Sequence, residues 1–460
     1  MLNLLFSLLI VIMTSLPTQA YASRDLFGVE MPSPPEPVSA GPYPVRYDPI
    51  PVRRSTFLAG LSENVHSWFR LTPSFGPDLV RTIIKEMNLA PPSHIHDPFS
   101  GAGTTAIEAS FEGFQASCVE VNPFLHFVGK TCIDWSIDAT EAARQLDAIS
   151  QIYSNTVDGA TLDNIAELGV EVPKIHNVHR WWRNDVLKDI LVLKSAIRSC
   201  SEDRYRSFFE LALAAVLVPD FTNVTLGKLQ LHFINKDNHE INVWPTYECH
   251  TLKMIGDLSD INRQALNVSP RIVFGDSTQV STFRDIIGVD AVITSPPYPN
   301  RYSYIWNTRP HLYMLDMISE AKEASQIDRR TIGGTWGTAT SELGKGVFAP
   351  IDPVVERALD GVHGNIAKSD QLMANYVTHY FNRLFIHIQA LRPSLNSGAR
   401  LAYVVGNSWI KGEYVATDVI LGKIIEGAIP GASIEGLHRF RRRNSGKDLF
   451  ETIVYARVPI

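Results

Sequence analysis

The sequence predicts a doubly wound α/β fold whose sheet is interrupted by a mostly helical insertion. Apolar segments of strand length alternate with helical patterns on both sides of the insertion. Turn residues follow directly after several of these strands, at the edge where open α/β sheets bind their ligands. The chain has 460 residues, of which 45% are hydrophobic and 20% charged. Such a chain can bury a large core, so a disordered or fibrous protein is excluded.

The first part of the sheet is predicted as a β-α-β unit. Apolar residues at helical spacing over 75–87 predict an amphipathic helix in front of it. The segment 94–99 has the character of a strand, a glycine turn at 100–105 follows, and the apolar residues after the turn return to helical spacing. A second strand, 115–121, carries Glu120 near its tip.

The second part of the sheet follows the insertion. Strands are predicted over 271–274 and 289–293, a helix over 376–391, and two further strands over 400–405 and 452–457. The predicted regions are an apolar N-terminal segment (1–22), a proline-rich extended arm (23–65), the first part of the sheet (66–130), the helical insertion (131–270) and the second part of the sheet (271–460), which includes a glycine-rich mobile insertion (319–370).

The N-terminal segment allows three interpretations. Its apolar run, 2–16, and the small residues around Tyr21 resemble a secretory signal. No Lys or Arg precedes Arg24, however, and the run is short for a membrane anchor. The third interpretation is a start assigned too early, with Met13 or Met31 as the true start. The motifs described below favour this third interpretation and a cytoplasmic protein.

Cysteine usage and charge constrain the compartment and the partners. The four cysteines lie far apart and form no CxxC pair, which argues against a disulfide framework or a structural zinc site and favours a reducing compartment. The formal net charge of −6 indicates neither a nucleic-acid nor a membrane partner, so any basic binding surface must be local. We expect no stable membrane association. The histidines show no clear metal-ligand spacing, and we expect no metal site.

The first motif that carries chemistry is the turn Asp97-Pro98-Phe99-Ser100-Gly101-Ala102-Gly103-Thr104-Thr105. Glycines after a strand let the backbone approach a ligand, and the helix behind them begins with free N–H groups. Glu120, at the tip of the next strand, is placed to hold ribose hydroxyls. No Gly-Lys-Ser/Thr follows, which disfavours a phosphate loop. A tight turn without a ligand remains the alternative.

The second motif is Thr294-Ser295-Pro296-Pro297-Tyr298, directly after an apolar strand. The two prolines stiffen the turn and remove two donors, which leaves carbonyl acceptors beside a hydroxyl and an aromatic face. Such a turn suits a flat base that carries an amino group: Ser295 and the Pro296 carbonyl accept the amine protons, and Tyr298 stacks on the ring. The alternative is a rigid proline loop with a packed tyrosine.

Together the two motifs resemble those of the DNA amino-methyltransferases that use S-adenosyl-L-methionine. That family has an Asp-Pro-Phe-x-Gly-x-Gly-Thr-Thr cofactor loop and a Ser/Asp-Pro-Pro-Tyr catalytic loop, and both occur here without a mismatch. The serine form is similar to the cytosine-N4 subfamily, whereas aspartate or asparagine is more usual in adenine-N6 enzymes. The resemblance covers about 75–128 and 271–460 and implies a Rossmann-like methyltransferase sheet. It leaves out the insertion, whose possible role in target recognition stays open.

The resemblance implies a role for each motif residue. Residues around the amino-acid part of S-adenosyl-methionine would be Asp97, Phe99, Gly101, Gly103 and Thr104, with Glu120 on its ribose and Asp276 at its adenine amino group. The catalytic loop would be Ser295, Pro296, Pro297 and Tyr298, acting on a base flipped out of double-stranded DNA.

DNA contacts are predicted from local charge. A basic cluster late in the chain and the basic and aromatic residues of 179–183 are candidates for contacts to DNA, and solvated faces or packed tryptophans are the alternatives. The basic cluster comprises Arg439, Arg441, Arg442, Arg443 and Lys447.

The leading hypothesis is a site-specific cytosine-N4 DNA methyltransferase. It would be the modification half of a restriction system, with a cognate nuclease as partner, or an orphan relative. Adenine N6 in DNA, or an amino group of RNA, is the second hypothesis, because the loop recognises an amine on a flat ring. A nicotinamide-dependent oxidoreductase built on Gly101 and Glu120 would leave the proline loop unexplained. A non-catalytic nucleic-acid binder would not need both motifs intact.

Overall fold

The computed structural model describes residues 41–226, 230–264, 266, 268–300, 302–334, 342–443 and 449–460. The predicted N-terminal segment, residues 23–40 of the proline-rich arm and Lys447 of the basic cluster therefore lie outside the described residues. Within the described part of the chain, no helix combines the length and the apolar character needed to cross a membrane.

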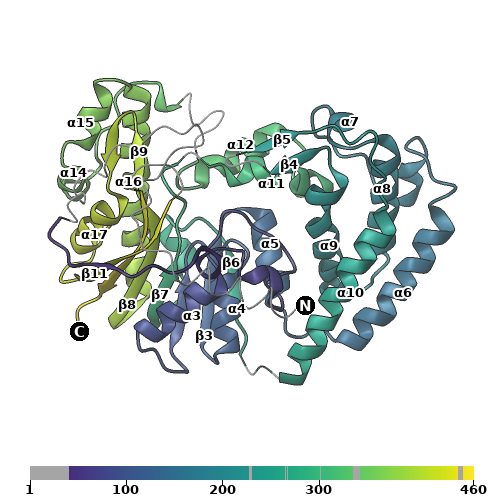
Figure 1. Ribbon diagram of the computed structural model, residues 1–460, viewed down its shortest axis with the longest axis horizontal. Coiled ribbons are helices and arrows are strands. Elements are labelled where there is room, and N and C mark those ends of the chain that lie inside the picture. The colour runs from purple at the N-terminus through teal and green to yellow at the C-terminus, as the bar shows by residue number, and fades with distance from the viewer. Residues whose placement is uncertain are drawn as a thin grey trace, which may run out of the picture.

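An eight-stranded sheet forms the centre of the molecule (Figure 1). Five neighbouring strands, β8-β7-β2-β3-β6, run parallel, and β12 pairs with β8 in the antiparallel direction. The strands in spatial order are β1 (Val45–Tyr47), β11 (Ser433–Arg442), β12 (Phe450–Arg457), β8 (Leu395–Gly406), β7 (Val289–Thr294), β2 (His94–Asp97), β3 (Gln115–Glu120) and β6 (Arg271–Phe274).

The two motifs lie at the point where the strand order reverses. From β2 the chain proceeds to β3 on one side, whereas from β7 it proceeds to β8 on the other, although β2 and β7 are parallel neighbours. The loops after both strands therefore leave the same edge of the sheet and diverge. In open α/β sheets such a switch point forms the ligand-binding crevice.

Helices cover both faces of the sheet. Side chains of a strand point alternately to opposite faces, and along β8 Leu401, Tyr403 and Val405 belong to one apolar core while Ala402 and Val404 belong to the other. The two layers are α3 (Pro77–Glu86), α4 (Thr104–Phe111) and α5 (Pro123–Cys132) in the first core, and α16 (Gln371–Leu391) and α17 (Thr417–Ala428) in the second. The predicted α/β fold is confirmed.

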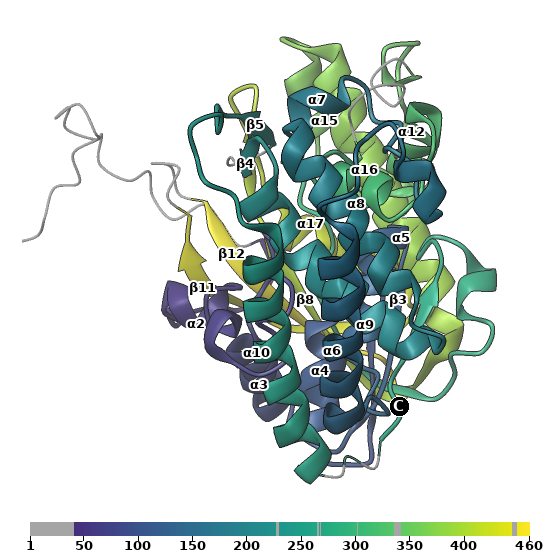
Figure 2. The same ribbon diagram turned by 90° about the vertical axis from the view of Figure 1, so that its right-hand side faces the viewer.

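The insertion between β3 and β6 is a helical bundle beside the sheet, as predicted (Figures 1 and 2). Its α9 lies against α5 of the first layer, so the insertion continues the core on that side. Its regular elements are α6 (Ala139–Thr156), α7 (Val178–Trp181), α8 (Asn184–Arg198), α9 (Asp203–Val216), the hairpin β4 (Val224–Leu226) and β5 (Leu231–Phe233), and α10 (Val243–Gln264).

Two segments have more regular structure than the sequence indicates. The end of the proline-rich arm is not only an extended arm, because Val45–Tyr47 pairs with β11 as an edge strand and Tyr43 is buried in the second core. The stretch 319–370 contains packed helices. Elements in and around these segments are α2 (Val52–Ser55), α11 (Tyr304–Met314), α12 (Ala321–Arg330), α14 (Pro353–Leu359), α15 (Val362–Ala367), β9 (Ser408–Ile410) and β10 (Glu413–Val415).

Candidate active site

The glycine turn after β2 is fixed by the carboxylate of Glu120. Gly101 and Gly103 have φ angles of +53° and +89°, a backbone region that favours glycine. The Gly101 N–H donates to Oε2 of Glu120 and the Asn122 N–H donates to Oε1, both at 2.8 Å. Each carboxylate oxygen therefore holds one loop at the carboxyl end of the sheet. Burial raises the pKa of Glu120 to about 7.

A first cavity of about 800 Å³ opens above this turn. A Cβ at Gly101 would lie 3.0 Å from Cδ2 of Leu71, so a larger residue there would need a small shift of Leu71 in addition to an unfavourable φ. The residues that line the first cavity include Phe99, Gly101, Thr104, Glu120, Asn122, Ser277, Ser295, Pro297 and Tyr304.

Asp97 lies beneath the first cavity and does not line it. Its buried carboxylate accepts hydrogen bonds from the Phe99 N–H at 2.9 Å, from the Thr105 hydroxyl at 2.8 Å and from the Thr294 hydroxyl at 2.5 Å. Burial raises the pKa of Asp97 to about 6. Asp97 thus positions the glycine turn, and Gly103, which also lies outside the cavity lining, begins the turn into α4.

Asp276 follows β6 and is held by a residue that sequence reasoning missed. Its neighbour Ser277 lines the first cavity, but Asp276 itself forms an ion pair with Arg383 of α16, with Nη2 at 3.2 Å from Oδ2. The same Nη2 donates to the carbonyl of Arg330 at 2.8 Å, and Arg330 lines the cavity. Arg383 lies 107 positions from Asp276, and no local pattern signals the pair.

The proline loop after β7 lies between the first cavity and a second one. Ser295 lines both cavities and donates from Oγ to the carbonyl of Val404 at 3.1 Å. The Pro297 carbonyl accepts a hydrogen bond from the Tyr380 hydroxyl at 2.8 Å, which fixes the turn. Tyr298 lines the second cavity only, and its ring rests on Gly406, where a Cβ would come within 2.7 Å of Cδ2.

The second cavity has a volume of about 590 Å³ and adjoins the first. The two cavities share Ser295, Tyr304 and the segment 73–75. The segment 73–75 precedes α3 and carries no motif, so its place in both cavities could not be predicted from local patterns. The other residues of the second cavity are Ser55, Tyr298, Asn300, Tyr302, Arg441, Arg443 and Glu451.

The predicted basic cluster is divided by the fold. Arg439 is buried, donates from Nε to Asp418 at 3.1 Å and from Nη1 to the Tyr47 hydroxyl at 3.0 Å, so its placement in a DNA-binding surface is wrong. A buried, paired arginine has no access to the phosphates of DNA. Arg441 and Arg443 line the second cavity, and Arg442 is exposed.

The aromatic residues of 179–183 pack as the alternative interpretation predicts. Trp181 and Trp182 are buried in the insertion. Arg180 stacks on Phe233 of the hairpin, with Cζ at 3.8 Å from the ring centroid, and Phe233 is partly exposed. The segment therefore contributes mainly to the core of the insertion.

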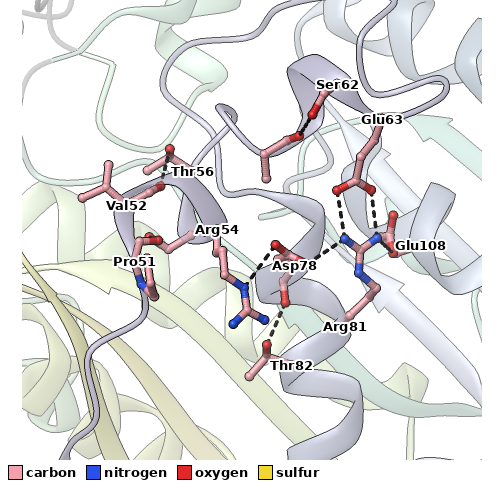
Figure 3. A network of polar contacts seen from close by, with 12 residues as sticks. Pro51, Val52, Arg54, Thr56, Ser62, Glu63, Asp78, Arg81, Thr82 and Glu108 are labelled. Atoms are coloured by element: carbon pink, nitrogen blue, oxygen red, sulfur yellow. Dashed lines mark hydrogen bonds and ion pairs between the residues drawn. The ribbon is translucent and has the colours of Figure 1, made fainter. Parts of the chain in front are cut away.

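A cluster with metal-ligating residue types lies apart from both motifs. Glu63, His66 and Glu108 bring potential ligand atoms within 4.8 Å of one another. Arg81 donates to both oxygens of Glu63 at 3.0 Å and to Glu108 at 2.9 Å (Figure 3). Because the guanidinium already binds oxygens of both carboxylates, we interpret the cluster as a structural ion-pair network.

Comparisons with known proteins relate the chain to methyltransferases. It is 22% identical to the Type II methyltransferase M.MvaI of Kocuria varians, over 76% of this chain and 78% of that one. It is 23% identical to M.BsoBI of Geobacillus stearothermophilus, over 81% and 79% of the two chains, and 24% identical to M.AvaI of Nostoc sp., over 81% and 80%. No protein-family model matches the chain.

Two solved structures share little beyond the outline of the fold. TrmN from Thermus thermophilus aligns at 10% identity with a TM-score of 0.29, over 88% of this chain and 52% of that one. The rRNA methyltransferase aviRa from Streptomyces viridochromogenes aligns at 8% identity with a TM-score of 0.32, over 88% and 96%. Similarity at this level adds nothing to the assignment.

The fold and the sequence comparisons define the class as α/β methyltransferase. Within that class the chain is a homologue of the Type II methyltransferases of the N4-cytosine and N6-adenine type, which confirms the family predicted from the two motifs. The methyltransferase homologues use S-adenosyl-methionine, which confirms the predicted cofactor and disfavours the nicotinamide hypothesis. The first cavity, with its glycine turn and the Glu120 carboxylate, fits this cofactor.

Proposed function

We propose that the protein is a site-specific DNA methyltransferase that transfers the methyl group of S-adenosyl-methionine to the exocyclic N4 amine of cytosine. Methyl transfer itself follows from the homologues, and the Type II relatives support DNA as the substrate. Ser295 in the proline loop favours cytosine. The Type II relatives also support a role as the modification half of a restriction system, with a cognate nuclease as partner.

One observation carries the proposal: the first and the second cavity meet at Ser295. A methyl donor bound in the first cavity and a flat base bound in the second would approach one another beside the hydroxyl of that residue. Holding two reactants in contact distance and alignment supplies a large part of a rate enhancement. The aromatic ring of Tyr298, in the wall of the second cavity, is placed to stack on a base.

The chemistry requires the amine lone pair to become available. The lone pair of an exocyclic amine is delocalised into the ring, which makes the amine a poor nucleophile. The Ser295 hydroxyl and the Pro296 carbonyl would each accept a hydrogen bond from one N–H of the amine, which directs the lone pair toward the methyl group, and the proton that the methylated nitrogen loses would pass to solvent. The bound cofactor supplies an electrophilic methyl on a sulfonium. No covalent bond to the protein is needed, so the scattered cysteines have no role.

Nucleoside analysis of the product tests the proposal. Purified protein is incubated with S-adenosyl-methionine and unmethylated DNA, with RNA in parallel, and the digested nucleosides are analysed by mass spectrometry. A Ser295→Ala preparation controls for contaminating host enzymes. We expect N4-methylcytosine in DNA. N6-methyladenine or methylated RNA would retain the mechanism and refute the cytosine-N4 assignment.

A further inference from the structure

Two arginines of the predicted basic cluster lie in the wall of a cavity and not on an open surface that could bind the phosphates of DNA. Arg441 and Arg443 line the second cavity together with Tyr298, whereas Arg442 between them is exposed. Alternate residues of a strand point to opposite faces, which explains why the run of three arginines divides in this way. Two cations therefore face the compartment that the proposed function assigns to the flipped base.

Arg443 is held beside Tyr298. Its Nη1 donates to the Asn407 carbonyl at 3.1 Å, and its Cζ lies 5.9 Å from the centroid of the Tyr298 ring. Asn407 directly follows β8, so a rigid strand end fixes the guanidinium. Among the described residues this is the one acceptor that the guanidinium uses, and a guanidinium carries five N–H donors.

Arg441 differs because its charge is already paired. Its Nε donates to Oε2 of Glu451 at 2.9 Å, and Glu451 is the residue opposite it on β12. The pair places a neutralised group in the wall of the second cavity. Arg443 is thus the arginine of this cavity whose charge is not paired with a carboxylate among the described residues.

We propose that Arg443 donates a hydrogen bond to O2 of the flipped cytosine and thereby selects cytosine over adenine, an inference that rests on the proposed function. When the amine of either base lies at Ser295, the next ring atom is a nitrogen acceptor in both. The third position of the edge is a carbonyl oxygen in cytosine and a C–H in adenine. A guanidinium N–H can donate to the carbonyl oxygen of cytosine but finds no acceptor at the C–H of adenine. Such a difference typically changes kcat/KM by about 10- to 100-fold.

The test compares Arg443→Met with Arg284→Met, which removes an exposed arginine on the β6–β7 connection, away from both cavities. After the methylated site of the wild type has been mapped, kcat/KM is measured on duplexes with cytosine or adenine at the target position. We expect Arg443→Met to lower kcat/KM for cytosine by about 10- to 100-fold, with little change for adenine and no change in cofactor affinity. Arg284→Met should match the wild type.

A second variant separates base recognition from phosphate binding. Arg443→Gln keeps an N–H donor and removes the charge, so it should retain part of the preference for cytosine. The salt dependence of DNA binding should be the same in wild type and Arg443→Met. Arg443→Met could instead lower kcat/KM equally on both duplexes, or reduce by about one the slope of log affinity for DNA against log salt concentration. Either result would indicate a phosphate contact and overturn the inference. A wild type without any methyl transfer would instead refute the proposed function on which it rests.

Discussion

The Thr294 hydroxyl donates a hydrogen bond of 2.5 Å to Oδ1 of Asp97, although the two residues lie 197 positions apart in the chain. Thr294 ends β7 and Asp97 ends β2, so the bond joins the two strands at the switch point. The glycine turn follows one residue and the proline loop follows the other. The bond therefore holds the loop predicted to bind the cofactor and the loop predicted to bind the base in a fixed relation.

We expect Thr294→Val to remove the hydrogen bond between the two loops while keeping the shape of the side chain. The substitution removes one donor to a buried carboxylate, which should lower the free energy of unfolding by about 1 to 2 kcal/mol. Urea denaturation measures this difference. Thr225→Val, at an exposed position of β4, is the matched control and should leave stability unchanged. Identical stabilities of the two variants would show that the bond contributes nothing.

The contribution of the buried Glu120 and Asp97 carboxyls to the stability of the cofactor-free protein should fall as the pH rises from about 4 to about 7. Burial raises the pKa of Glu120 from 4.5 to about 7 and that of Asp97 from 3.8 to about 6. The folded chain then binds protons more tightly than the unfolded chain, and stability gained by protonation is lost as each carboxyl ionises. Thermal denaturation across this range measures the effect. Glu120→Gln lacks the contribution of Glu120, so the stability of the wild type relative to this variant should fall as the pH rises, and a difference that stays constant with pH would contradict the assignment.

Gly406→Ala should impair methyl transfer and leave cofactor affinity intact. An added Cβ would come within 2.7 Å of the Tyr298 ring, so the ring must shift in the second cavity, while Gly406 does not line the first. A misplaced reactant commonly costs about 10- to 100-fold in rate. Methyl incorporation and calorimetry of cofactor binding provide the two readouts. Gly364→Ala, where a Cβ would meet nothing within 4 Å, should behave as the wild type.

Removing divalent metals should not change the activity. Arg81 already donates to both oxygens of Glu63 and to one oxygen of Glu108, so a cation would have to displace the guanidinium. Methyl transfer measured before and after dialysis against a chelator tests this expectation. A loss of activity that added metal restores would reassign the cluster as a metal site.

The parts of the fold that could be predicted depend on local patterns. Residues 94–99, the glycine turn and the strand ending at Glu120 form β2, the turn into α4 and β3, because strand periodicity and glycine turns are local signals. The apolar run before Ser295 became β7 for the same reason. Parallel order then brought the two motifs to one edge.

What could not be predicted depends on partners that are distant in the sequence. Val45–Tyr47 becomes a strand only because β11 offers an edge to pair with. The sequence around Arg439 predicts a surface cation, whereas in the fold Arg439 is buried and pairs with Asp418 of α17. Arg383 acquires its role through Asp276, 107 positions away. Charge in a sequence indicates neither burial nor pairing.

The most direct test of the account is methyl transfer by Ser295→Ala with cofactor affinity measured on the same preparation. Ser295 lines both cavities, and its hydroxyl is one of the two proposed acceptors for the amine protons. Loss of a preorganised hydrogen-bond partner should lower the single-turnover rate by at least about 100-fold, with cofactor affinity unchanged. Ser281→Ala, at an exposed position, serves as control. A Ser295→Ala variant that transfers methyl groups at the wild-type rate would contradict the assignment of the reaction to this junction.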